Sequence, residues 1–290
     1  MGIVIGTLEQ GIIYAILALG VMITYKILDF PDLTVDSSFP LGAAVSAVLT
    51  LQGMHPALTL VCASLAGAGA GLITGIIHVK FKVRDLLSGI ITMTALYSVN
   101  LRIAGKANLP IFGTDTLFKL DTVKLLPKGY ETLIVAGVVL LIAKILLDLF
   151  LKTKAGYLLR AVGDNEKVVT TLSKDSGRVK IIGLCIANAL VAFSGAVMCQ
   201  QQRFFEISMG TGAIVIGLAS VIIGINLFGK IKFITTTTCV IIGSILYKAC
   251  VTLAISLGFA PTDMRLVTAL LFLAILVMGQ MKQKKGDLHA

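Results

Sequence analysis

The chain consists of long apolar stretches that charged residues and glycine or proline clusters interrupt at intervals typical of membrane-spanning helices. Of its 290 residues, 57 % are hydrophobic and only 14 % are charged, too few to cover the surface of a soluble globule of this size. A bilayer core needs about 20 apolar residues per helix. Dividing the chain at the interruptions gives the segments 3–25, 39–53, 57–79, 85–103, 130–151, 179–199, 210–228, 233–257 and 264–281. We therefore expect an all-α, polytopic transmembrane bundle of about 8–10 spans, forming one domain over residues 1–290.

The longest polar interruption, residues 151–180, carries seven of the 25 basic residues. Positively charged loops resist export across the membrane, so we expect this loop on the cytoplasmic side. The other basic clusters that alternation places on that side are Lys80, Lys82 and Arg84; Lys230 and Lys232; and Lys282, Lys284 and Lys285. The loops at 104–129, 200–209 and 258–263 then lie outside, as does the N-terminus. Cytoplasmic loops and lipid headgroups explain the net charge of +10 better than nucleic-acid binding does.

Residues 27–44 place three aspartates and two prolines between apolar spans. Pro31 and Pro40 are expected to prevent a continuous helix. The short apolar segment 39–53 is then half of a broken helix, or a helix packed inside the bundle. If this stretch enters the membrane, Asp36, Ser37 and Ser38 are candidates for a translocation path, because charge inside a membrane is costly and usually functional. A solvated cytoplasmic turn with capping Asp and Ser residues explains the same spacing equally well.

The 151–180 loop is expected to fold as helix, turn and helix. Gly156 and the triplet Gly163, Asp164 and Asn165 provide turn and N-cap chemistry. Residues 166–173 are expected to form a short helix that Gly177 ends. Such a helix, parallel to the membrane, could dock onto a cytoplasmic partner. The alternative interpretation of the loop is a solvated basic connector.

Glycine recurs inside the spans, at Gly67, Gly69, Gly71 and Gly75 and again at Gly210, Gly212, Gly217 and Gly224. This pattern is typical of helices that approach closely in a bundle. The sequence has no GxSxG, HExxH or Walker A motif and its three histidines are scattered, so we expect no catalytic site, metal or cofactor. Gln200, at the end of the sixth span, is expected to be a polar helix terminus, or a contact for substrate or a docked protein on the outer face.

Two motifs carry a resemblance to a known family. The run LKTKAGYLLRAVGDNEKVV, followed by GRVKIIGLCIANALVAFSGAVMCQQQ, resembles the cytoplasmic loop and next helix of ABC importer permeases of the branched-chain amino acid and ribose permease superfamily. Thr153, Gly156, Arg160, Ala161 and Gly163 match the TxxGxxxRAxG stretch that leads into a coupling helix there. The segment DLTVDSSFPLGAAVSA is similar to the tryptophan/tyrosine-type branch, with Ser37 where that branch generally has glycine. The resemblance extends from about residue 9 to 281.

The resemblance implies a type II importer fold in a bacterial cell membrane. Its partners would be two cytoplasmic ABC ATPase subunits, an extracytoplasmic substrate-binding protein, a second permease subunit that we expect to be a copy of this chain, and membrane lipids. By the same resemblance the translocation path or gate would include Asp32, Thr34, Asp36, Ser37 and Ser38. ATPase coupling would fall to Arg160, Ala161, Gly163, Asp164, Asn165 and Glu166.

We therefore expect a non-enzymatic permease subunit of an importer for a small solute, most simply an amino acid, with aromatic amino acids favoured by the family. ATP hydrolysis would occur in the partner subunit. The alternative is a stand-alone, ion-coupled secondary carrier or channel for a small polar solute. An intramembrane enzyme is disfavoured because the sequence offers no nucleophile, base or metal cluster.

Overall fold

The structure is a computed structural model that describes residues 2–120, 123, 127, 129–165, 169, 175–229, 231, 233–258, 266, 268–270, 273, 274 and 277. Seven of the described helices are long and apolar enough to cross a membrane, and an eighth apolar helix, Val35–Leu51, is shorter. The prediction of an all-α, multi-pass membrane bundle is therefore confirmed. Most of the expected last segment, 264–281, lies outside the described residues.

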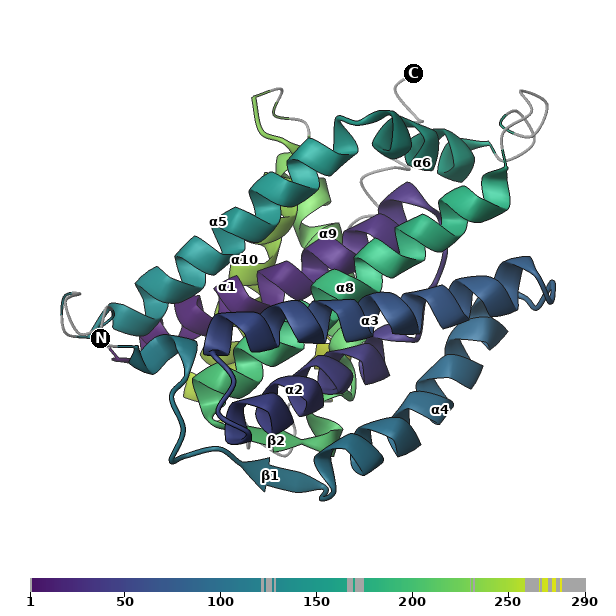
Figure 1. The fold of residues 1–290 in the computed structure, drawn as a ribbon. Helices are drawn as coiled ribbons and strands as arrows, with labels where there is room; N and C mark the ends of the chain where they lie inside the picture. Colours follow the sequence, from purple (N-terminus) through teal and green to yellow (C-terminus); the bar gives the residue numbers. More distant parts are fainter. Residues whose placement is uncertain are drawn as a thin grey trace.

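The helices form one bundle (Figure 1). In chain order they are α1 Gly2–Met22, the π-helical η1 Ile23–Ile27, α2 Val35–Leu51, α3 Pro56–Val79, α4 Asp85–Ala104, the 3-10 turn η2 Leu117–Lys119, α5 Glu131–Leu151, α6 Lys154–Asp164, α8 Ser176–Gln202, the 3-10 turn η4 Ile207–Gly210, α9 Ala213–Phe228 and α10 Thr236–Ser256. Two short strands, β1 Asn108–Pro110 and β2 Phe204–Glu206, pair antiparallel. A long connection that includes β1 joins α4 to α5.

Local sequence explains where several helices begin and end. α3 starts at Pro56, whose missing N–H costs nothing at the first helical position. α4 ends at Gly105, which adopts the left-handed backbone that favours glycine. α10 starts after Thr235, whose hydroxyl accepts a hydrogen bond from the Thr238 N–H.

The two ends of the bundle differ in character. The basic end holds η1, the α3–α4 turn, the α5–α6 junction and the starts of α8 and α10, which border two cavities there. The opposite end, here the sheet end, holds β1 and β2, which Figure 1 shows at the edge away from α6. Thr7 near the N-terminus contacts Thr252 near the end of α10 at 2.9 Å, so the N-terminus also lies at the sheet end.

This arrangement groups the loops as the charge pattern predicts. The turn with Lys80, Lys82 and Arg84 lies at the same end as the described part of the 151–180 loop. The connections after α4 and after α8 meet at the other end, through the β1–β2 pair. The predicted basic clusters at 230, 232 and 282–285 lie outside the described residues.

α8 lies in the middle of the bundle and packs against α1, α2 and α3. Its contact with α3 depends on glycine. A Cβ at Gly71 would overlap the Leu184 carbonyl, and one at Gly67 would overlap the Asn188 carbonyl. The close packing expected from the glycine pattern is confirmed for this pair of helices, where small residues let the two backbones approach.

Pro40 does not interrupt α2, which corrects the expectation that it prevents a continuous helix and that the second apolar segment begins at residue 39. α2 starts at Val35 and passes through Pro40. Neighbouring elements support the helix at this point: the Asn100 side chain of α4 donates to the Ser37 carbonyl at 3.0 Å. A proline in a membrane helix is tolerated where neighbouring helices hold the backbone in this way. The expectation that the segment packs inside the bundle is confirmed, since most of α2 is buried.

Candidate functional site

Two interrupted helices meet inside the bundle. From the basic end, the chain leaves η1, passes through residues 28–34 and starts α2 at Val35. From the sheet end, it leaves β2, passes through η4 and starts α9 at Ala213. Asp36, in the first turn of α2, joins the two starts: its carboxylate accepts hydrogen bonds from the backbone N–H groups of Gly212 at 3.2 Å and Ile214 at 2.8 Å. A negative charge at a helix N-terminus complements the helix dipole and the unpaired N–H groups there.

A buried polar network holds residues 28–34 against α8. Asp32 is 1 % exposed, and its Oδ2 accepts a hydrogen bond from the Asn188 side-chain amide at 2.7 Å. Its Oδ1 accepts from the Thr34 N–H at 2.9 Å. The Asn188 Oδ1 accepts in turn from the Ser38 hydroxyl at 2.7 Å. Asn188 is the thirteenth residue of the 27-residue helix α8, so this network lies near the middle of the span.

The hydroxyls of Thr34 and Ser37 contact α3 and α4. The Thr34 and Thr74 hydroxyls lie 2.9 Å apart. The Ser37 hydroxyl donates to the Met93 carbonyl at 2.8 Å. Ser37 lies inside α2, and its backbone is not in the left-handed conformation that favours glycine. Serine in place of the glycine of the similar branch therefore adds a hydrogen bond without changing the path of the backbone.

The predicted path residues are therefore not a solvated turn. Asp32, Thr34, Ser37 and Ser38 are buried, and Asp36 is half-buried. The structure brings Asp32 and Ser38 together through Asn188, while Thr34 is directed to α3, Ser37 to α4 and Asp36 to α9. The segment thus links four different helices. A displacement of this segment would therefore change contacts with all four helices.

Helix α6 forms the described part of the predicted coupling loop. The Thr153 hydroxyl accepts a hydrogen bond from the Gly156 N–H and begins the helix. Its apolar residues Leu159 and Val162 are buried. The second half of α6 contains Arg160, Ala161, Gly163 and Asp164, and Asn165 is its C-cap residue. Glu166 lies outside the described residues.

Three glycine assignments in this loop are wrong, because Gly156, Gly163 and Gly177 all lie inside helices and none forms a turn or ends a helix. Gly156 lies in the first turn of α6, where a Cβ would come 2.6 Å from the Phe150 carbonyl. Glycine there lets α6 fold back closely on the end of α5. Gly177 lies in the first turn of α8 and ends no helix. A Cβ at that position would lie 2.5 Å from Val79, so this glycine serves the α3–α8 contact.

The end of α6 lies directly against the last residue of η1 and the start of residues 28–34, here called the interrupted segment. A Cβ on Gly163 would overlap the Ile27 carbonyl and come 3.2 Å from the Leu28 Cα. Leu28 also packs with Leu159 around Gly183 of α8. A cavity of about 290 Å³ beside this contact is lined by Lys26, Arg160 and Asp164 among others. α6 therefore has a direct mechanical contact with the chain that leads to Asp32.

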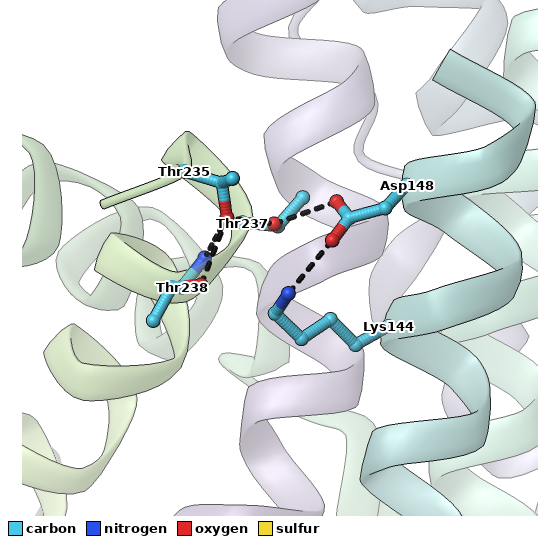
Figure 2. Close-up of polar contacts among 5 residues, drawn as sticks. All are labelled: Lys144, Asp148, Thr235, Thr237 and Thr238. Atoms are coloured by element: carbon cyan, nitrogen blue, oxygen red, sulfur yellow. Dashed lines mark hydrogen bonds and ion pairs between the residues drawn. The ribbon is translucent and has the colours of Figure 1, made fainter. Parts of the chain in front are cut away.

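A second polar cluster at the basic end connects α5 to α10 (Figure 2). Lys144 and Asp148, one turn apart on α5, form an ion pair at 2.7 Å. The other carboxylate oxygen of Asp148 accepts a hydrogen bond from the Thr237 hydroxyl at 2.7 Å. Thr235 in turn contacts the hydroxyls of Thr237 and Thr238. This cluster fixes the start of α10 to the last turn of α5.

The sequence analysis did not single out two polar residues that lie inside spans, of which Asn188 completes the network around Asp32. Asn188 is a lone amide in an apolar run, and Lys248 is a lone cation inside α10, whose Nζ lies 4.0 Å from the centre of the Tyr14 ring. A polar residue inside a span was the available signal. Gln200 lies in the last turn of α8, as expected of a polar helix terminus, and its side chain is fully buried. Its amide donates to Thr59 at 2.8 Å and accepts from the Leu117 N–H at 2.9 Å.

Comparison with known proteins identifies the family. Residues 3–277 match the family described as branched-chain amino acid transport system / permease component. The chain is 45 % identical to a tyrosine transport system permease protein of Clostridioides difficile, over 96 % of this chain and 92 % of that one. It is 32 % identical to an uncharacterized protein of Rickettsia prowazekii over 99 % and 100 % of the two chains.

More distant similarity reaches sugar permeases. The chain is 27 % identical to the ribose import permease protein of Escherichia coli K12, over 75 % of this chain and 67 % of that one. No solved structure matches. With a family match over nearly its whole length, the chain belongs to the permease components of branched-chain amino acid-type transport systems.

Proposed function

We propose that this chain is the membrane-spanning subunit of an ABC importer that carries an amino acid, with tyrosine or another aromatic amino acid as the substrate class. Family membership supports the transport role, and similarity to a tyrosine transport system permease over almost the whole chain supports the substrate class. On this proposal residues 1–290 form one permease domain. ATP is hydrolysed in separate cytoplasmic ATPase subunits, a binding protein delivers substrate from outside, and a second copy of the chain completes the path.

The observation that carries the coupling mechanism is the contact between α6 and the interrupted segment. Gly163 lies against the Ile27 carbonyl, and residues 28–34 lead from there to Asp32 and Asp36. In this proposal Arg160, Ala161, Gly163, Asp164 and Asn165 face the ATPase, and Glu166 joins them on the strength of the family motif. Closure of the ATPase dimer on ATP displaces α6, and the displacement reaches the start of α2.

The path or gate is then formed by Asp32, Thr34, Asp36, Ser37 and Ser38. Their contacts with α3, α4, α8 and α9 are packed in the present conformation. Opening the path would require α2 and α9 to separate at Asp36 or α2 and α8 to separate at Asn188. Each of these contacts is a hydrogen bond that can exchange for water or for a polar substrate.

The test is affinity purification of the chain from its native membrane in mild detergent, followed by identification of co-purifying proteins and reconstitution in vesicles. We expect an ATP-hydrolysing partner, and uptake of tyrosine that depends on ATP and exceeds uptake of leucine and ribose. Uptake by the purified chain alone, driven by an ion gradient without ATP, would establish the stand-alone carrier instead. ATP-driven uptake of ribose in preference to tyrosine would contradict the substrate class alone.

A further inference from the structure

A cavity of about 610 Å³ opens at the basic end, away from α6 and from the path residues. It lies between the α3–α4 turn and the start of α8. Lys82, Arg84 and Lys180 contribute basic side chains to its lining, and Asp85 and Asp175 contribute acidic ones. The packing of Gly177 on Val79 brings the two elements together beside it.

One of the two acidic side chains of the cavity is already ion-paired, and the other accepts a hydrogen bond in the first turn of α4. Asp175 forms an ion pair with Arg178 at 2.9 Å and accepts a hydrogen bond from the Arg178 N–H at 3.1 Å. Asp85 accepts a hydrogen bond from the Leu86 N–H at 2.9 Å. Within the described residues, Lys82 and Arg84 have no acidic partner. The lining holds three basic side chains against two acidic ones, of which Asp175 is already paired with Arg178, so the cavity keeps a net positive charge.

The backbone holds these two cations at the mouth of the cavity. Lys82 has a left-handed backbone, with φ of 54°, a conformation that a side chain other than Asn, Asp or His adopts rarely. His78 of α3 contacts the Val83 carbonyl at 2.9 Å through Nδ1, which fixes the turn between them. Lys82 and Arg84 are themselves exposed. A constrained turn that displays two cations beside a cavity is suited to a bound anion.

We propose that this cavity binds a phosphate group, supplied either by the headgroup of an anionic phospholipid or by a free phosphate compound of the cytoplasm. Arg84 offers paired N–H donors to phosphate oxygens, while Lys82 and Lys180 add charge around them. Basic pockets between membrane helices on the cytoplasmic side are suited to lipid headgroups. α4 continues from the cavity with the exposed apolar side chains of Leu86, Leu87 and Ile90, a surface on which an acyl chain could lie.

The test uses the full chain in mild detergent and a matched pair of double variants. The cavity variant is Lys82→Gln with Arg84→Gln. The control variant is Lys152→Gln with Lys154→Gln, which removes the same charge from exposed positions at the same end of the bundle. Binding of phosphatidylglycerol, of phosphatidylcholine with the same acyl chains, and of inorganic phosphate is measured by calorimetric titration.

The wild-type chain should bind phosphatidylglycerol in preference to phosphatidylcholine, and the cavity variant should lose roughly thirtyfold in affinity while the control stays within about threefold of wild type. Saturable binding of inorganic phosphate, lost in the cavity variant alone, would identify a free phosphate compound as the ligand. An equal loss in both variants would show attraction by overall surface charge, and no loss in either would show that the cavity binds no phosphate. Both of these results overturn the proposal. None of these measurements depends on which solute the chain transports.

Discussion

The carboxylate of Asp36 accepts a hydrogen bond from the backbone N–H of Ile214 at 2.8 Å, joining the start of α2 to the start of α9. A side chain in the first turn of one helix thus caps the first turn of another helix, which enters the bundle from the opposite end. Because the remaining N–H groups of a helix start are costly to bury unpaired, this contact fixes where the two interrupted helices meet.

Replacing Asp36 by alanine is expected to destabilise the chain and to abolish uptake. Loss of a helix cap costs about 1 kcal/mol, and the buried start of α9 would in addition lose its only described side-chain partner. Thermal unfolding in detergent and uptake by reconstituted vesicles measure the two effects. Asp115→Ala, at an exposed position, is the control. If both variants unfold and transport alike, Asp36 does not hold the α2–α9 contact.

Replacing Asn188 by alanine should cost more stability than replacing Ser38. Asn188→Ala leaves buried Asp32 without the amide that donates to Oδ2, and a buried charge-bearing group without its partner costs about 1–3 kcal/mol. Ser38→Ala removes only the hydrogen bond to Asn188 and should cost about 1 kcal/mol. Denaturation midpoints of the two variants in one detergent decide the point. Equal losses would mean that the Asp32–Asn188 bond contributes nothing beyond the Ser38 contact.

Replacing Gly163 by alanine should uncouple ATP hydrolysis from uptake. The added methyl group would overlap the Ile27 carbonyl, so the end of α6 must move away from η1. We expect uptake per ATP hydrolysed to fall about tenfold, which corresponds to roughly 1.4 kcal/mol, while the ATPase partner still co-purifies. Gly137→Ala on α5, where a Cβ meets nothing within 4 Å, is the matched control. Unchanged coupling in Gly163→Ala would remove α6 from the transmission route.

Replacing Thr237 by valine should weaken the attachment of α10 to α5. The change keeps the side-chain shape but removes the hydroxyl that donates to Asp148 (Figure 2). The expected cost is about 1 kcal/mol or more, because the lost hydrogen bond is made to a carboxyl group that also pairs with Lys144. Thr236→Val, an exposed position in the same turn, is the control. A thermal midpoint that drops in the Thr236 variant as much as in the Thr237 variant would argue against this contact.

Apolar length and loop charge were sufficient to predict the spans and the end of the bundle at which each described loop lies. The segments 85–103 and 130–151 agree closely with α4 and α5, because charges and Gly or Pro residues interrupt the chain where it leaves the membrane. The prediction failed at Pro40, because its helix is held by Asn100 of another helix. Gly177 was misread for a similar reason: its function is contact with Val79 and not a turn.

The sequence singled out the residues of the candidate site but not their contacts, and their part in a transport path stays a prediction. Three aspartates near two prolines marked residues 27–44 as unusual, and the family resemblance assigned a role to five of them. Their partners are distant in sequence: Asn188 lies 156 positions from Asp32, and Gly212 lies 176 positions from Asp36. No local period or motif relates residues so far apart, and only the packing of α8 and α9 brings them together.

The long separation between Asp36 and its partners also constrains how the chain is made. The ribosome delivers α2 to the membrane long before Gly212 and Ile214 exist, so for most of synthesis the Asp36 carboxylate has none of the N–H groups that it contacts in the finished bundle. Until then the first helices lack this contact, and a carboxylate inside a membrane without a partner is costly. This contact forms only after α9 has been made, so a chain that stops before residue 212 leaves the Asp36 carboxylate without these two N–H groups.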